Sequence, residues 1–203
     1  MLANGILLEN VGASLIRVIA GFFLGAAAGL MVGILMGWSR VVNRSLSPLV
    51  GMLFPIPTLG WLPLLMLWLG LNEALPITLI SICSFFPILY NTVTGIKGVD
   101  EQYIRTARTL GAGPIMILSR IVIPMALSNI FTGLRLEAGM AWRTVIAAEM
   151  FAIPTGIGAL LINAESLIRV DIIIVCLAIL AFMSLAFERV FLWLEIKATG
   201  SWR

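Results

Sequence analysis

The chain consists mainly of long apolar runs that are separated by short polar stretches. Three of these runs, at 18–39, 45–72 and 74–96, contain no charged residue. Each reaches the roughly 20 residues that a helix needs to cross the hydrocarbon core of a membrane. Two further apolar segments extend from about 124 to 150 and from about 170 to 193. Because helices satisfy their own backbone groups in lipid, the pattern predicts an all-α protein with about five membrane-spanning helices.

The longest charge-rich passage lies between the third and fourth apolar segments, at residues 100–124. Asp100 is followed by Glu101, and acidic residues of this kind favour the start of a helix. Residues 111–114, Gly-Ala-Gly-Pro, end that helix, and Pro114 is suited to be the first residue of a second one. The passage therefore predicts two short helices at an angle. Two interpretations remain open, a surface that binds another protein and an ordinary polar loop.

Composition and charge define the class of protein and its orientation. Of 203 residues, 61% are hydrophobic and 11% are charged, which indicates an integral membrane protein with one domain over 1–203. The basic residues gather on one side of the predicted spans, as cytoplasmic loops require, if the N-terminus lies outside and the C-terminus inside. These inner residues are Arg40, Arg44, Lys97, Arg105, Arg108, Arg120, Arg189, Lys197 and Arg203. The outer loops then hold Glu9, Glu73, Glu165 and Asp171, with Arg17 and Arg169 as basic exceptions.

The first span carries a ridge of glycines at every fourth position. Residues four apart lie on one face of a helix, so the ridge predicts close packing against another helix, in this subunit or in a second copy. Its members are Gly21, Gly25, Gly29, Gly33 and Gly37.

The second span is interrupted by prolines. A Pro-x-Pro pair, Pro55 and Pro57, removes backbone hydrogen bonds and breaks a helix. Broken helices persist in membranes where protein or a water-filled cavity satisfies the freed groups. Together with Thr58 and Trp61, these prolines are candidates for the wall of a pathway. A purely structural kink is the alternative.

The fourth span carries charges at membrane depth, where they are costly and usually face a bundle interior or a cavity. Arg135 and Glu149 share a face with Trp142, whereas Glu137 lies almost opposite. Trp142, Arg143 and Glu149 are further candidates for the pathway, and Arg135 for a structural anchor. Residues 150–170 contain Pro154, Gly156 and Gly158, and we expect an outer loop with a short, partly re-entrant helix.

The sequence indicates no enzyme. Neither Lys97 nor Lys197 stands in a P-loop, so the chain is not expected to hydrolyse ATP. It has no histidine, and Cys83 and Cys176 lie in apolar runs without metal-ligand spacing, so no cofactor or metal site is expected. The small net charge of +3 reflects topology and does not indicate nucleic-acid binding. An ion channel, a secondary transporter or a purely structural membrane subunit remain the alternatives to a transporter subunit driven by a partner.

The charge-rich passage has the spacing of a known signature. Arg105-Thr106-Ala107, three residues, Gly111, nine residues and then Ile121-Val122-Ile123-Pro124 match the EAA motif of permease subunits in bacterial ABC importers. Segments along most of the chain, among them PIPTLGWLPLLMLWLG from Pro55 and TGLRLEAGMAWRTVIAAEM from Thr132, resemble the nitrate/sulfonate/taurine branch of that superfamily. Two departures stand out, since Arg105 replaces the leading glutamate of the motif and Thr106 its first alanine. The chain also begins near the span that is usually second in this branch. The resulting arrangement, five spans with the N-terminus outside, resembles the core of methionine-type permeases.

The resemblance implies a type I importer permease in the bacterial inner membrane. Residues 97–124 would form a cytoplasmic coupling loop that docks on separate ABC ATPase subunits, which bind ATP and Mg. A second permease subunit, as a homodimer, would complete the pathway, and an extracytoplasmic binding protein would deliver a small oxyanion or sulfonate such as nitrate, taurine, an alkanesulfonate or bicarbonate. The expected docking residues are Arg105, Thr106, Ala107, Arg108, Leu110, Gly111, Ala112 and Gly113.

Overall fold

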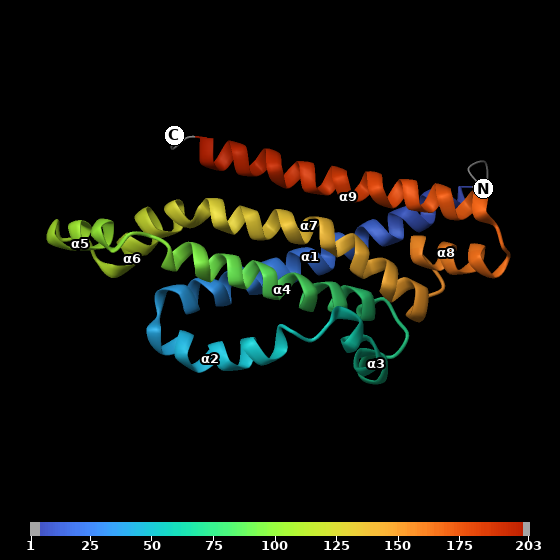
Figure 1. Ribbon diagram of the computed structural model, residues 1–203, viewed down its shortest axis with the longest axis horizontal. Helices are drawn as coiled ribbons and strands as arrows, with labels where there is room; N and C mark the ends of the chain where they lie inside the picture. The colour runs from blue at the N-terminus through green and yellow to red at the C-terminus, as the bar shows by residue number, and fades with distance from the viewer. Residues whose placement is uncertain (1–4, 201–203) are drawn as a thin grey trace.

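The computed structural model describes residues 5–200, and these form a helical bundle with its long helices side by side (Figure 1). Arg203, counted above with the inner cations, lies outside the described residues. In chain order the elements are α1 Ile6–Trp38, α2 Arg40–Leu53, α3 Thr58–Leu69, α4 Ala74–Lys97, α5 Glu101–Thr109, α6 Pro114–Ile117, the π-helical segment η2 Leu118–Val122, α7 Ile123–Ala152, α8 Ile157–Ser166 and α9 Val170–Thr199.

The predicted all-α architecture with about five spans is confirmed. Four helices, over Ile6–Trp38, Ala74–Lys97, Pro114–Ala152 and Val170–Thr199, are long and apolar enough to cross a membrane. The pair α2 and α3 passes the same test together and is bent by 93° between Leu53 and Thr58. The prolines of this segment therefore break the second span, because Pro57 ends the turn in an extended conformation and α3 begins after it.

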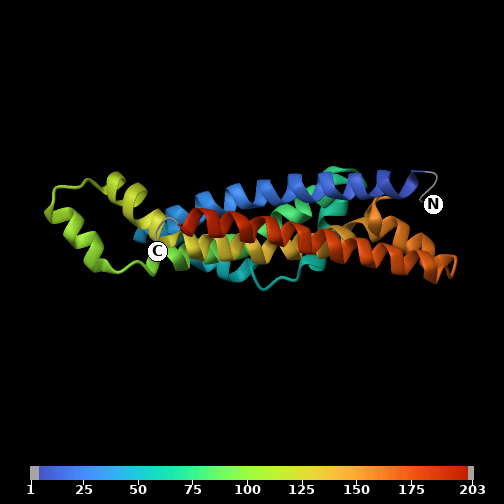
Figure 2. The same cartoon turned by 90° about the horizontal axis from the view of Figure 1, so that it is seen from above.

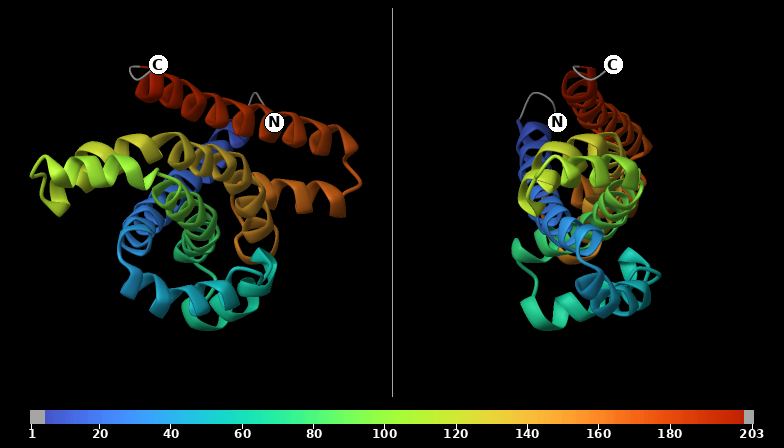
Figure 3. Two further views of the ribbon diagram at one scale, coloured as in Figure 1. Left: turned by 60° about the vertical axis from the view of Figure 1, so that its left-hand side comes forward. Right: turned by 90° about the vertical axis from the view of Figure 1, so that its left-hand side faces the viewer.

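Helix α4 lies in the middle of the bundle, with α1, α3 and α7 packed against it (Figure 3). The glycine ridge of α1 faces α4 of the same chain, which answers the question that the sequence left open. A Cβ added at Gly21 would lie 2.6 Å from Cβ of Ile80, and one at Gly29 would lie 2.7 Å from the carbonyl oxygen of Phe85. These distances leave no room for a side chain, so the backbones of α1 and α4 approach closely along most of their length.

The first span begins earlier than predicted. The charge-free run started at residue 18, whereas α1 begins at Ile6 and includes both Glu9 and Arg17. The placement of Arg17 in an outer loop was therefore wrong, because its side chain is 3% exposed and lies within the bundle. A buried charge can continue a membrane helix when acidic partners surround it, and Arg17 has two such partners, described below.

The fourth span also begins earlier than predicted. Pro124 was expected to start it, but α6, η2 and α7 form one continuous helical stretch from Pro114 to Ala152. In a regular α-helix the ring of Pro124 would meet the carbonyl group of Arg120 and could donate no hydrogen bond to it. The π-helical turn Leu118–Val122 ends two residues before this proline, and the N–H of Ile123 donates to the carbonyl oxygen of Leu118. The wider turn thus lets the helix pass the proline without ending.

Candidate functional site

The loop between α4 and α7 projects beyond the ends of the long helices (Figure 2). We call residues 100–117 the projecting loop. The Asp100 carboxylate accepts a hydrogen bond of 2.8 Å from the N–H of Gln102 and so caps α5. Gly111 has φ +83°, a conformation that favours glycine, and Pro114 is the first residue of α6. The predicted start and end of the first helix are therefore both present, and the chain reverses direction between the two helices.

Most of the projecting loop faces outward. Leu110 and Ile115 are 82% and 84% exposed, which is unusual for large apolar side chains in a charged loop. Ala107 is 8% exposed and holds α5 against the rest of the loop. Of the remaining predicted docking residues, Ala112 is half-buried. The others are exposed, namely Arg105, Thr106, Arg108, Gly111 and Gly113. The loop thus presents an apolar surface with charges around it, which is suited to contact another protein.

Arg105, the residue that departs from the motif, has a partner within its own helix. Its guanidinium donates a hydrogen bond of 2.7 Å to the carboxylate of Glu101, one turn earlier. This hydrogen bond is the main reason why the pKa of Glu101 lies below its usual value. Both side chains are largely exposed, so the pair leaves Arg105 accessible.

The predicted pathway residues fall into two groups. Pro55 and Pro57 form the exposed turn between α2 and α3, next to Thr58 at the start of α3. Trp61, on the first turns of α3, packs partly buried against α4 and lines an apolar pocket of about 350 Å³ with Leu53. The residues of α7 point in different directions, since Arg143 is exposed whereas Trp142 and Glu149 are buried. The structure therefore does not bring all seven residues together on one surface of this chain.

A partly buried ionic cluster at the opposite end of the molecule was missed by the sequence prediction. It consists of Ser14, Arg17, Glu73, Glu149 and Thr155. Arg17 donates two hydrogen bonds of 2.6 Å to Glu73, one of 2.7 Å to Glu149 and two to Thr155, so all five of its N–H groups are used. The hydrogen bonds from Arg17 lower the pKa of the Glu73 carboxyl, which lies at the start of α4.

The same cluster holds the start of α8. The Glu149 carboxylate accepts hydrogen bonds from Ser14 at 2.7 Å and from the N–H of Gly158 at 3.0 Å. Asn10 accepts one of 2.6 Å from the N–H of Gly156. A Cβ added at Gly156, which has φ +106°, would collide with the Glu149 carboxylate. The free amides at the beginning of α8 are thus satisfied by side chains of α1 and α7, and four segments meet at one point.

A sequence signal for this cluster exists. Arg17 lies four residues before Gly21, in register with the glycine ridge, so it is on the face of α1 that packs against α4. The register predicts burial for Arg17, and a buried arginine requires acidic partners. Elsewhere on α7, Arg135 lies 3.3 Å from Glu195 of α9, and Glu137 accepts a hydrogen bond of 3.3 Å from Ser84.

Comparison with known families gives one match over most of the chain. The profile of the family described as "Binding-protein-dependent transport system inner membrane component" matches residues 13–198. A putative ABC transporter permease of Methanocaldococcus jannaschii is 44% identical over 97% of this chain and 74% of its own length. The taurine transport system permease of Escherichia coli is 34% identical over 89% and 66%, respectively. A putative aliphatic sulfonates transport permease of Bacillus subtilis is 38% identical over 81% and 60%.

The chain thus spans about two thirds or less of the length of the last two relatives. Solved structures share the fold. A chain of an amino acid ABC transporter superimposes with a TM-score of 0.77, covering 96% of this chain and 95% of its own, at 21% sequence identity. A chain of the MetNI methionine ABC transporter gives a TM-score of 0.74, covering 92% and 94%, at 16% identity.

Proposed function

Since this chain belongs to the family of binding-protein-dependent transport system inner membrane components, we propose that it is the permease subunit of an ATP-driven importer for a small solute. The observation that carries the proposal is the projecting loop. It combines the spacing of the coupling signature with an exposed helix–turn–helix whose first helix is capped by Asp100. A channel or a secondary transporter has no use for such a surface.

The projecting loop faces the cytoplasm and docks on separate ATPase subunits, which bind and hydrolyse ATP with Mg. The N-terminus lies outside and the C-terminus inside. Leu110 and Ile115, exposed on the two sides of the Gly111 turn, are inserted into a groove of the ATPase. Because α6 continues into α7 without a break, movement of the docked loop is transmitted to the fourth span.

The pathway forms between two copies of the chain. The bent helices α2 and α3 expose large apolar side chains, among them Phe54, Leu59 and Trp68, that a second copy would cover. Arg143, exposed on α7, lines the pathway in this arrangement. A binding protein delivers the solute to the outer face, where α8 and the ionic cluster lie.

The substrate is a small sulfonate or oxyanion. This assignment rests on the relatives that are named for taurine and for aliphatic sulfonates. Selection belongs mainly to the binding protein, so a ligand retained by that partner would identify the substrate.

Purification and reconstitution test the proposal. The tagged chain is expected to retain a soluble ATPase in stoichiometric amount. In vesicles that also contain the binding protein, uptake of a labelled sulfonate is expected to require ATP inside and to persist when ion gradients are dissipated. Uptake that follows an ion gradient without the ATPase would overturn the proposal and support a secondary transporter.

A further inference from the structure

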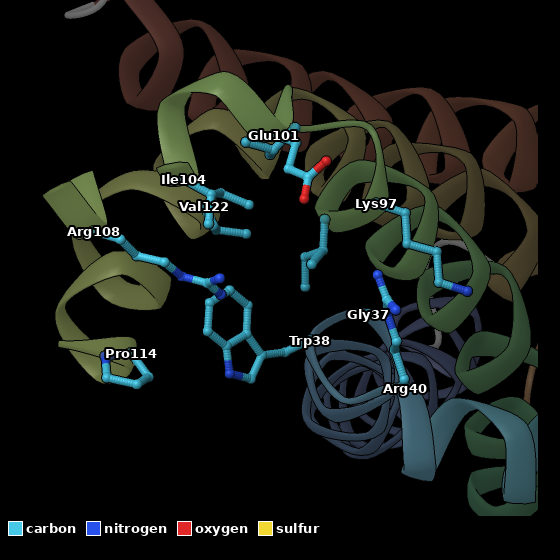
Figure 4. Close-up of a pocket in the computed structure, with 11 residues that line it drawn as sticks. Gly37, Trp38, Arg40, Lys97, Glu101, Ile104, Arg108, Pro114 and Val122 are labelled. Carbon is cyan, nitrogen blue, oxygen red and sulfur yellow. The ribbon is translucent and has the colours of Figure 1, made fainter. Parts of the chain in front are cut away.

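A second hollow lies at the root of the projecting loop. It is a pocket of about 520 Å³ between the junction of α1 and α2 on one side and the loop on the other. Trp38 and Arg40 line it from the first side, and Ile104 and Arg108 from the second (Figure 4). The pocket is therefore built from segments that are more than sixty residues apart in the sequence.

The pocket carries unpaired positive charge. Arg40 and Arg108 are exposed, and within residues 5–200 neither has a carboxylate oxygen within 4.0 Å. Lys97, at the rim, donates a hydrogen bond of 2.8 Å to the side chain of Asn43. Glu101 is the acidic residue of the wall; it forms a salt bridge of 2.7 Å with Arg105, and Arg40 and Arg108 are close enough to lower its pKa further. The wall thus carries three cations, Arg40, Lys97 and Arg108, against one carboxylate, and neither arginine forms a salt bridge within residues 5–200.

The position of the pocket defines what can reach it. Helices α1 and α4 end at Trp38 and Lys97, and an indole ring with adjacent cations marks the interface between membrane and water. Under the topology of the proposed function, this is the level of the cytoplasmic lipid headgroups. Basic pockets between helices on this side of a membrane bind anionic headgroups, and guanidinium groups bind phosphate in a bidentate manner.

We propose that this pocket binds the phosphate headgroup of an anionic phospholipid of the cytoplasmic leaflet. Arg40 and Arg108 hold the phosphate, and Trp38 forms the apolar wall towards the acyl chains. The bound headgroup connects the α1–α2 junction to α5, and so it holds the root of the projecting loop against the membrane helices. The orientation in this inference rests on the proposed function, whereas binding itself does not.

Native mass spectrometry of the purified chain tests the proposal. The chain is exchanged into micelles that contain phosphatidylglycerol or phosphatidylcholine, and the retained lipids are counted without ATPase or binding protein. Each arginine near a headgroup contributes about 1 kcal/mol, so R40Q and R108Q are each expected to weaken retention of phosphatidylglycerol about fivefold, and the double variant about thirtyfold. The double variant R40K/R108K should recover most of the loss, because it keeps both charges.

R44Q is the matched control, since Arg44 is an exposed arginine one turn further along α2 that does not line the pocket. Equal retention by the wild type and R40Q/R108Q would overturn the proposal, and so would an equal loss in R44Q, which would indicate a diffuse basic surface. Displacement of the lipid by millimolar inorganic phosphate would assign the pocket to a soluble anion instead. If no lipid is retained, and ATPase added in a separate measurement protects Arg40 and Arg108 from an arginine-modifying reagent, the pocket belongs to an acidic segment of that partner instead. None of these results depends on uptake, so they are separable from a failure of the importer function.

Discussion

The two ends of the molecule differ in whether their charged side chains are buried or exposed. At one end, Arg17 and Glu149 are 3% and 0% exposed, and every N–H of the arginine donates to an acceptor within the chain. At the other end, Arg105 and Glu101 are paired but largely exposed, and large apolar side chains point outward. The first arrangement is complete by itself and stabilises the fold. The second leaves its charges and apolar side chains exposed, as expected of the docking surface that we propose.

The largest expected effect on uptake comes from a charge introduced into the projecting loop, the proposed docking surface. Gly111→Asp places a carboxylate at a turn with φ +83° and open space around it, so insertion into the membrane should be unaffected. A charge without a partner in a desolvated contact is strongly unfavourable, and ATP-driven uptake should be abolished. The measurement is uptake in reconstituted vesicles, with ATP hydrolysis followed in parallel.

Gly5→Asp is the matched control, because Gly5 also has a positive φ, +71°, and open space around it. Gly5 precedes the first residue of α1 and is not part of the projecting loop. It should retain uptake. Normal uptake by Gly111→Asp would contradict a docking role for the turn.

The next largest effect is expected on the stability of the ionic cluster around Arg17. Arg17→Ala leaves the Glu149 carboxylate buried without its cation, and breaking a buried ion pair in this way costs about 3–5 kcal/mol. The expected result is a clear fall in the melting temperature of the purified chain. Arg169→Ala removes an exposed ion pair with Asp171 and should change the melting temperature little. A melting temperature of Arg17→Ala equal to that of Arg169→Ala would show that the cluster does not stabilise the fold.

A smaller loss of stability is expected at the contact between α1 and α4. Gly25→Leu forces a side chain against the backbone of Ser81, and such overpacking typically costs about 1–3 kcal/mol. Gly12→Leu lies on the same helix where nothing approaches within 4 Å, so it serves as the control in the same thermal measurement. Equal melting temperatures for the two variants would argue against the tight contact.

The smallest effect is expected at the position that departs from the motif. Arg105→Glu restores an acidic residue but places it one turn from Glu101, where like charges repel weakly. We expect a modest change in affinity for the ATPase, with uptake retained, and Arg105→Gln separates the loss of the positive charge from the gain of the negative one. If all three forms bind the ATPase equally, position 105 has no special role.

Local chemistry in the sequence was sufficient to predict the projecting loop and the broken second span. The Asp100 cap, Pro114 and the Pro55–Pro57 pair each act on the backbone within a few residues of themselves, so their effects can be inferred without the fold. The glycine spacing predicted close packing but could not name the partner, because that depends on which helix lies opposite.

The ionic cluster could not be predicted in full from sequence. Glu73 and Thr155 are 56 and 138 residues from Arg17, and only the packing of the spans brings them together. The assignment of topology from charges also hid the burial of Arg17, because every charged residue near the end of a span was placed in a loop. The start of α7 was misplaced for a related reason, since a proline was taken as a helix start where a π-helical turn accommodates it.

The unbroken stretch from Pro114 to Ala152 has 39 residues. At about 1.5 Å per residue it measures about 58 Å along its helix axis, nearly twice the thickness of the hydrocarbon core. One end of this stretch adjoins the Gly111 turn, which we propose docks on the ATPase, and the other end carries Glu149, which binds the start of α8. In that proposal, a displacement at the docked end passes along one helix to the ionic cluster and crosses the π-helical turn Leu118–Val122 on the way. Under the same proposal, a substitution that stiffens this turn would change how much of the movement reaches the ionic cluster, while leaving the docking turn and the cluster themselves unchanged.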